Sequence, residues 1–193
     1  DFMKNIRRRV KFDPDEVLWR LRHAVDRNGN LYPDHPMRNM MPVLDINHGD
    51  RFDHLVSMSS RSVMLNRYAA SMYGDDHPYA SKKMALGDYN ATLIRTVNGK
   101  LITLNHDTHT PHPRESFRIQ GTSGVYLRNR VDSKIYIEGL SPEEHNWESA
   151  EKYVKEYEHP MIQNYNPPKR KGGAIRGHGS RDTKTPINWH RLI

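Results

Sequence analysis

The segment "DYNATLIRTVNGKLITLNHD", residues 88–107, is the strongest structural signal in this chain of 193 residues. Two runs rich in β-branched and aliphatic residues flank Asn98 and Gly99. This pair favours positive φ at both central positions of a type I′ turn. We therefore predict an antiparallel hairpin centred on Asn98 and Gly99, and we interpret the turn as part of a sheet rather than of a binding site.

Further strands are predicted on both sides of this hairpin. A short strand begins at about residue 52, and Leu55, Val56 and Met58 fit it. The segments "ESFRIQG" (115–121), "GVYLRN" (124–129) and "SKIYIEG" (133–139) indicate three more strands separated by glycine turns. Hairpin connections of this kind are typical of an antiparallel sheet.

Three helices are predicted to flank the strands. The first covers about residues 14–26, with Asp13 as its cap, and ends before Gly29. The second begins with Pro33 and continues toward Ile46. The third is predicted from a capping box at residues 141–144 and continues to about Tyr157. Residues 160–193 read as an irregular basic tail.

This order of elements predicts an α+β fold with a mostly antiparallel sheet and flanking helices. We assign residues 1–193 to a single domain. The chain has neither a GxGxxG nor a Walker sequence, so we predict no Rossmann domain and assign no cofactor-binding residue in it. The segment "GTSG", residues 121–124, lies between two predicted strands, and we interpret it as a turn rather than a phosphate site.

The composition is polar but typical of a folded protein. Apolar residues make up 35% of the chain and the mean hydropathy is −0.90, yet ten tyrosines and nine methionines exceed what a disordered chain normally carries. The net charge is +7, but the basic clusters at 7–9 and 169–171 lie near opposite ends, so we do not expect nucleic-acid binding.

The chain contains no cysteine. We recognise no signal peptide and no apolar stretch long enough to cross a membrane in this sequence, so we expect no membrane partner. The compartment is left open, and a secreted or periplasmic bacterial location agrees with folding without disulfides.

Two groups of residues are candidates for chemistry. The stretch "RNGNLYPDHP", residues 27–36, brings Tyr32 and His35 together around Pro33, and it is either an active-site corner or an ordinary turn. A helix that begins at Pro33 would disfavour the protonated form of His35. The stretch "HDTHTPH", residues 106–112, has no zinc-ligand spacing, so we interpret it as a polar strand end and loop and expect no metal site.

Seven motifs follow one another along residues 17–179: "WRLRHAVDRNGNLYPDH", "DINHGDRFDHLVSMSSRS", "GDYNATLIRTVNGKLITLNHDT", "QGTSGVY", "IYIEG", "YEHP" and "GHG". In this order they resemble glycoside hydrolase family 109, which comprises NAD-dependent α-N-acetylgalactosaminidases built on the Gfo/Idh/MocA oxidoreductase fold. The resemblance covers the C-terminal half of the family only.

This resemblance implies a function for the chain. The N-terminal domain that holds NAD in the family has no counterpart here, and the partner would be a glycan that contains N-acetylgalactosamine. The implied mechanism is redox-assisted elimination, in which the sugar is oxidised at carbon-3, loses its carbon-2 proton and then its leaving group. Tyr32 and His35 match a tyrosine and a histidine of the family motif "NLYPTHG". They are therefore predicted to be catalytic and to bind the substrate.

The chain departs from that motif at Asp34 and Pro36, and we expect Pro36 to disfavour helical geometry at His35. Two alternatives stay open. One is a non-catalytic carbohydrate-binding or oligomerisation module left after loss of the cofactor domain. The other is a different Gfo/Idh/MocA oxidoreductase, whose sheet would also form a homo-oligomer. The isolated chain is expected to be inactive and to bind NAD weakly or not at all.

Overall fold

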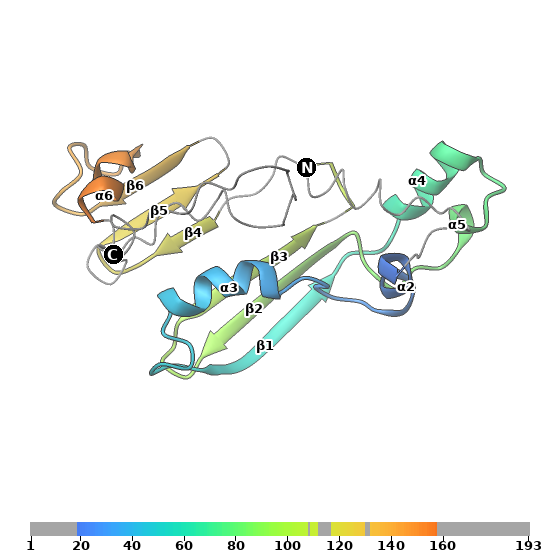
Figure 1. Ribbon diagram of the computed structural model, residues 1–193, viewed down its shortest axis with the longest axis horizontal. Coiled ribbons are helices and arrows are strands. Elements are labelled where there is room, and N and C mark those ends of the chain that lie inside the picture. Colours follow the sequence, from blue (N-terminus) through green and yellow to red (C-terminus); the bar gives the residue numbers. More distant parts are fainter. Residues whose placement is uncertain (1–18, 108, 112–116, 130–131, 158–193) are drawn as a thin grey trace, which may run out of the picture. The chain divides into compact units, whose positions relative to one another are not determined.

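The computed structural model describes residues 19–107, 109–111, 117–129 and 132–157 (Figure 1). The chain divides after residue 113 into two compact units, which we describe separately. In both units, all pairs of neighbouring strands are antiparallel, and helices accompany the sheets. The α+β prediction is therefore confirmed, although the strands form two sheets. The assignment of residues 1–193 to one domain stays a prediction.

The sheet of the first unit has three strands in the order β1-β2-β3. They are β1 (Phe52–Ser59), β2 (Tyr89–Thr96) and β3 (Leu101–Asp107). The predicted hairpin is β2 and β3, which pair from Arg95 and Leu101 to Tyr89 and Asp107. The prediction of a strand near residue 52 is also confirmed.

The turn of this hairpin differs from the predicted type I′ turn. Gly99 has a φ of 84°, but Asn98 is not among the described residues with positive φ. The Gly99 N–H donates to the Thr96 carbonyl at 3.0 Å, which gives a three-residue loop that ends in glycine. A buried carboxylate explains why the chain forms this loop and not a type I′ turn. Asp50 accepts from the Asn98 N–H at 3.3 Å and from the Thr96 hydroxyl at 2.8 Å.

Substitution of Gly99 by valine should lower the free energy of unfolding by about 1 kcal/mol or more, because a β-branched residue is strained at positive φ. Nothing lies within 4 Å of the position that a Cβ would take, so the backbone alone causes the loss. Urea denaturation measures it. An unchanged midpoint would show that the residue does not hold this conformation.

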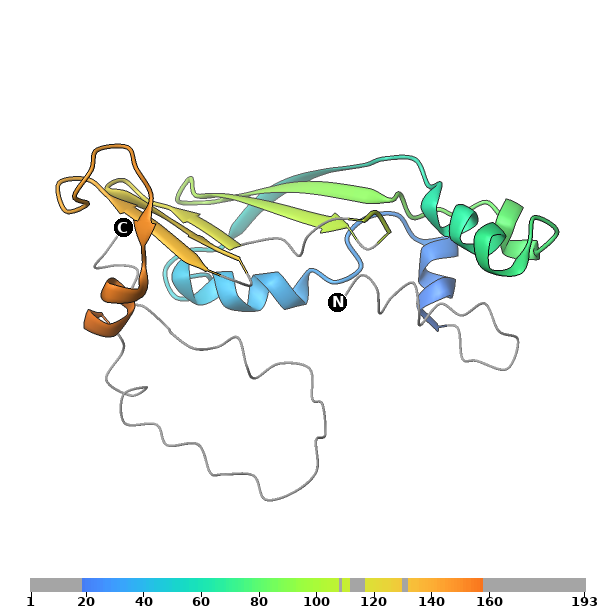
Figure 2. The same cartoon turned by 90° about the horizontal axis from the view of Figure 1, so that it is seen from above.

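One face of the sheet is covered by a helix. Along β2 and β3, buried and exposed residues alternate, and Ile94, Ile102 and Leu104 point to the covered side. They pack against Met37 of α3 (Asp34–Val43), which lies along this inner face in Figure 2. The sequence prediction of a second helix is confirmed, although the helix ends three residues before Ile46.

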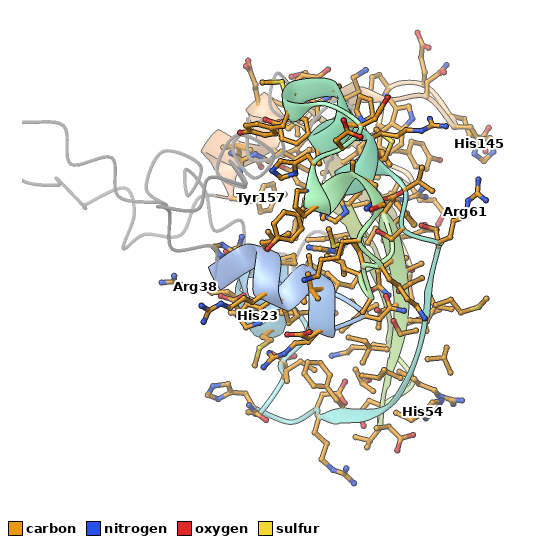
Figure 3. The ribbon with its side chains drawn as sticks, turned by 90° about the vertical axis from the view of Figure 1, so that its right-hand side faces the viewer. His23, Arg38, His54, Arg61, His145 and Tyr157 are labelled. Carbon is orange, nitrogen blue, oxygen red and sulfur yellow. The ribbon has the colours of Figure 1, made fainter. Side chains whose placement is uncertain are left out.

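The opposite face of the sheet, which we call the open sheet face, is exposed. Its large apolar side chains are Val56, Met58, Leu93 and Leu101, with exposed fractions of 62%, 81%, 42% and 66%. Figure 3 shows Arg38 of α3 and His54 of β1 projecting from opposite sides of the first unit. Assembly of copies through the sheet stays a prediction.

A second core lies among three helices of the first unit, α2 (Trp19–Asp26), α4 (Met64–Tyr73) and α5 (Pro78–Ser81). We call it the helical core, and its buried members are Leu21, Ala24, Leu65, Ala69, Met84 and Leu86. The end of the predicted first helix is confirmed, and Gly29 follows it with a φ of 121°. Residues 14–18 of that predicted helix lie outside the described residues.

Helix α4 was not predicted, since the pattern after residue 52 was interpreted as strand. Its start depends on Asp88, whose carboxylate accepts from the N–H groups of Val63 at 2.9 Å and Met64 at 3.1 Å. This cap comes from 24 or 25 residues further along the chain. Local sequence signals for a helix start are therefore missing at residue 63.

The second unit contains a four-stranded sheet in the order β4-β5-β6-β7. The strands are β4 (Phe117–Gln120), β5 (Gly124–Arg128), β6 (Ser133–Ile137) and β7 (Glu148–Ser149). Three of them are the predicted strands. The buried side chains of Ile119, Tyr126 and Ile135 lie in register across β4, β5 and β6 and form the centre of this sheet.

The predicted helix from residue 141 is wrong, because α6 covers only Glu151–Glu156. The Ser141 hydroxyl does not cap a helix. It accepts from the Ile137 N–H at 2.9 Å and donates to a Glu148 oxygen at 2.7 Å, so it connects β6 to β7. The Tyr153 hydroxyl donates to the same Glu148 oxygen at 2.8 Å. These tertiary hydrogen bonds replace the local capping box.

No helix among the described residues is long and apolar enough to cross a lipid bilayer. The predicted basic tail at 160–193 lies outside the described part of the chain.

Candidate functional site

The loop between α2 and α3 fixes the position of Tyr32. The Asn30 side-chain oxygen accepts from the Tyr32 N–H at 2.8 Å, which closes a local turn. The Asn28 side-chain oxygen accepts from the Gly87 N–H at 3.1 Å and ties the same loop to the start of β2. The half-buried Tyr32 ring packs against the helical core. Both its backbone and one side of its ring are therefore held.

His35 lies in the first turn of α3, as the sequence predicted. The Met37 N–H donates to the Pro33 carbonyl at 3.1 Å, so the helix forms around His35. The expectation that Pro36 would disfavour helical geometry at His35 is wrong. An N–H in the first turn has no partner within the helix, so proline loses no hydrogen bond there.

The His35 side chain is 53% exposed and lies beside the Tyr32 ring. The two ring centroids are 6.0 Å apart, with planes inclined by 60°. The nearest carboxylate oxygen of Asp34 is 3.9 Å from His35 Nε2. The structure thus brings the two predicted site residues together, with the imidazole on the exposed side.

A third residue, His106, joins this pair and was missed as a site residue. It lies near the end of β3 on the inner face, where it is 7% exposed. Its ring stacks on Tyr32, with centroids 5.9 Å apart and planes inclined by 27°. In the sequence, His106 stands out only as a candidate metal ligand within the stretch of residues 106–112. The alternation of Ile102, Leu104 and His106 was the signal that would have placed it on the buried face.

The buried environment determines the charge of His106. The pKa of His106 is lowered from the ordinary 6.5 to about 4, mainly by desolvation, with nearby His109 adding to the shift and Asp107 opposing it. The imidazole is therefore neutral at neutral pH. Among the described residues, no group forms a hydrogen bond with its Nε2. A buried polar atom in that state costs about 1–3 kcal/mol.

The turn after β3 surrounds His106 with hydrogen-bonded polar groups. The Asp107 carboxylate accepts from the N–H groups of His109 at 3.1 Å and Thr110 at 2.9 Å. The buried His109 ring lies with Nδ1 3.5 Å from an Asp88 oxygen, the carboxylate that caps α4. Within the described residues, no group of three or more side chains could hold a metal ion. His112 of the same motif lies outside them.

The inner face of the sheet is polar where the start of β2 pairs with the end of β3. Asn90 of β2 lies opposite His106, and its side-chain amide donates to the hydroxyls of Ser57 at 2.9 Å and Ser59 at 2.8 Å. The Thr92 hydroxyl donates to the Asn90 oxygen at 3.1 Å. The inner face therefore changes along the strands, from an apolar half under α3 to a polar half near Tyr32.

The stability of the first unit should depend on pH through His106. Because its pKa is lower in the folded state, the unfolded chain takes up the proton first as the pH falls below 6.5. Stability that is present above pH 6.5 is then lost toward pH 4, by about 2 kcal/mol between pH 7.5 and pH 5. Urea denaturation at both values measures it. In His106→Phe, the loss of unfolding free energy between pH 7.5 and pH 5 should be smaller by about 2 kcal/mol than in the wild type. An equal loss in the wild type and in His106→Phe would show that His106 does not cause it.

A separate hollow of about 350 Å³ lies between α4 and α5. Its lining includes Ser62, Asn66 and Arg67, but none of the three rings described above. The Asn66 side-chain amide is already engaged, since it donates to the carbonyls of Tyr79 at 2.9 Å and Lys82 at 2.8 Å. The chemistry-bearing residues and this hollow are therefore different features.

The "GTSG" turn, residues 121–124, does not fit the pyrophosphate of a dinucleotide. In the "GTSG" turn, the Gly121 N–H donates to the Gly124 carbonyl at 2.9 Å. This turn joins β4 to β5, and no helix begins there. Backbone amides that could cradle a phosphate at a helix start are thus absent from this turn.

Comparison with known proteins gives a consistent result. Residues 6–185 match the family described as "Glycosyl hydrolase 109, C-terminal domain". A "Glycosyl hydrolase family 109 protein" of Stenotrophomonas maltophilia (strain K279a) is 39% identical over 178 residues, which are 90% of this chain and 38% of that protein. The "Alpha-N-acetylgalactosaminidase" of Tannerella forsythia is 37% identical over 147 residues, 76% of this chain and 31% of that protein.

A third relative, a "Glycosyl hydrolase family 109 protein" of Parabacteroides distasonis, is 33% identical over 168 residues, 86% of this chain and 34% of that protein. The chain therefore spans between 31% and 38% of the length of these three relatives.

Proposed function

Because the chain belongs to glycosyl hydrolase family 109, whose C-terminal domain it matches, we propose that it forms part of an α-N-acetylgalactosaminidase. In this proposal the chain supplies one wall of the sugar site. The observation that carries it is the group of three rings, with Tyr32 between the exposed His35 and the buried His106.

The chemistry of these side chains suits a sugar. A phenol and an imidazole can each donate and accept hydrogen bonds, which matches the hydroxyl groups of a hexose. His35 is exposed enough to be reached by a ligand, and Tyr32 is half-buried beside it. We infer that Tyr32 orients a sugar hydroxyl and that His35 Nε2 or Nδ1 transfers or holds a proton at the reacting sugar.

We infer that the cofactor implied by the family resemblance is bound by another domain. Two observations support this inference: the "GTSG" turn does not fit a pyrophosphate, and the relatives are much longer than this chain. When bound by another domain, NAD would supply reversible hydride acceptance. We therefore assign to this chain only the binding and orientation of the sugar and proton transfer to it.

The test uses the complete family 109 enzyme that carries this domain. It should release the aryl group from an aryl α-N-acetylgalactosaminide, and the matching α-galactoside, which lacks the N-acetyl group, should be a poorer substrate. Tyr32→Phe should lower this turnover. His54→Ala is the matched control, because His54 lies on the open sheet face and its ring nitrogen Nδ1 is 3.1 Å from the adjacent Asp53 carboxylate.

The outcomes separate the candidate functions. Turnover of the N-acetyl substrate that depends on Tyr32 supports the proposal. Binding of N-acetylgalactosamine without any turnover would instead support a carbohydrate-binding module. Release from both substrates that is equal in the wild type and in Tyr32→Phe would contradict the site.

A further inference from the structure

We propose that His106 is a positioning residue of this site, whose buried imidazole stacks on the Tyr32 ring and fixes the direction of the phenol hydroxyl. The inference rests on the proposed function for its catalytic consequence. Its structural part, the dependence of the Tyr32 ring on His106, is independent of the substrate.

Three contacts hold Tyr32 in place. Its backbone N–H is bound by Asn30, and one side of its ring packs on the helical core. The ring stacks on His106 at 5.9 Å with a small interplanar angle. The phenol oxygen lies on the Cβ–Cγ axis, so χ1 sets its position, and the O–H bond prefers the plane of the ring. A stacked neighbour blocks movement of the ring out of its plane and therefore restricts both the position of the oxygen and the direction of the O–H bond.

His106 is itself held firmly enough for this role. It belongs to β3 and lies opposite Asn90, whose amide is bound to Ser57 and Ser59 of β1. The imidazole is 7% exposed, so a sugar does not reach it directly. It consequently acts through Tyr32, and it is not a catalytic residue.

Titratable groups lie around this stack. Asp107 follows His106 on the same strand, His109 and its partner Asp88 lie beside the turn, and His35 lies on the other side of Tyr32. The neutral form of His106 places an uncharged ring against Tyr32. A proton on His106 would add a cation in a buried space that already contains His109.

A double-mutant cycle in the complete enzyme tests the proposal. His106→Ala should lower kcat about tenfold in the wild type, because Tyr32 loses its support. In the Tyr32→Phe background, where the hydroxyl is already missing, the same change should lower kcat less than twofold. Equal losses in the two backgrounds would overturn the proposal, because His106 would then act independently of the hydroxyl.

His106→Phe is the second variant, because it keeps an aromatic ring and removes both nitrogens. It should retain at least half of the wild-type kcat at pH 7.5, with KM unchanged. A loss as large as that of His106→Ala would mean that the nitrogens, not the stacked ring, carry the effect, and would overturn the proposal. Because phenylalanine fills the same buried space, this variant decides the question even where alanine impairs folding.

NMR of the same enzyme with labelled tyrosine separates this inference from the proposed function. The Tyr32 ring resonances should be shifted by the stacked imidazole, move in His106→Ala and stay near their wild-type positions in His106→Phe. Tyr32 resonances that are unchanged in His106→Ala would overturn the inference, whatever the activity. An enzyme without activity on N-acetylgalactosaminides, but with the expected shifts, would refute the proposed function alone.

Discussion

Replacement of His35 by alanine in a complete family 109 enzyme that carries this domain should lower turnover about a hundredfold or more, the usual scale for a positioned acid–base group. The reason is the position of the ring. His35 projects from the first turn of α3 on the exposed side of Tyr32, with ring centroids 6.0 Å apart. With its side chain 53% exposed, it is more accessible than the buried His106, and in the proposed function it is the imidazole that contacts the sugar.

Steady-state kinetics with an aryl α-N-acetylgalactosaminide measures this loss. His54→Ala serves again as the control, since it removes an exposed imidazole of similar surroundings and should leave kcat/KM unchanged. Thermal unfolding of His35→Ala should match that of the wild type, because the side chain is 53% exposed. If turnover and substrate affinity of His35→Ala stay at wild-type values, Tyr32 and His35 form an ordinary turn.

Replacement of Gly87 by alanine should destabilise the first unit by about 3 kcal/mol, the upper part of the usual range for overpacking. A Cβ at this position would lie 2.2 Å from the Ser60 carbonyl oxygen and 2.9 Å from the Ser59 Cβ. Neither neighbour can move easily. Ser60 donates its N–H to the Tyr89 carbonyl at 2.9 Å, and Gly87 donates its own to Asn28 at 3.1 Å.

Gly99→Ala is the matched control for this variant. It adds the same carbon atom at a position where nothing lies within 4 Å, so only the positive φ of 84° opposes it, at about 1 kcal/mol. Urea denaturation measures the loss of unfolding free energy in each variant, which reports steric overlap in Gly87→Ala and backbone strain in Gly99→Ala. Equal losses would show that the backbone at Ser60 relaxes to accept the methyl group.

Elements whose signals are local could be predicted from the sequence. The hairpin of β2 and β3 alternates cleanly around Gly99, and the end of α2 and the start of α3 follow from Gly29 and Pro33. Elements that depend on distant partners could not. Helix α4 begins where Asp88 binds its first N–H groups, and the Ser141 capping box is replaced by hydrogen bonds to Ile137 and Glu148.

The candidate site also contains residues with local sequence signals and a residue that depends on distant partners. Tyr32 and His35 are three residues apart, and both match residues of one family motif, so the sequence predicts them. His106 is far away in the sequence and reaches Tyr32 only because β3 and the helical core hold the two rings together. Its burial and its lowered pKa are tertiary properties. The alternation along β3 indicates that His106 faces inward, but it does not show that the Tyr32 ring lies against it.

The open sheet face also determines how this molecule will react with oxidants. Met58 is 81% exposed, whereas Met37 and Met84 are 7% and 6% exposed. Peroxide will therefore convert the Met58 thioether to the sulfoxide well before either buried methionine, since exposure governs access to the sulfur. The sulfoxide is polar, so this reaction makes an apolar strand more hydrophilic. Peptide mass mapping of methionine oxidation thus becomes a direct reporter of whether anything covers β1 in solution.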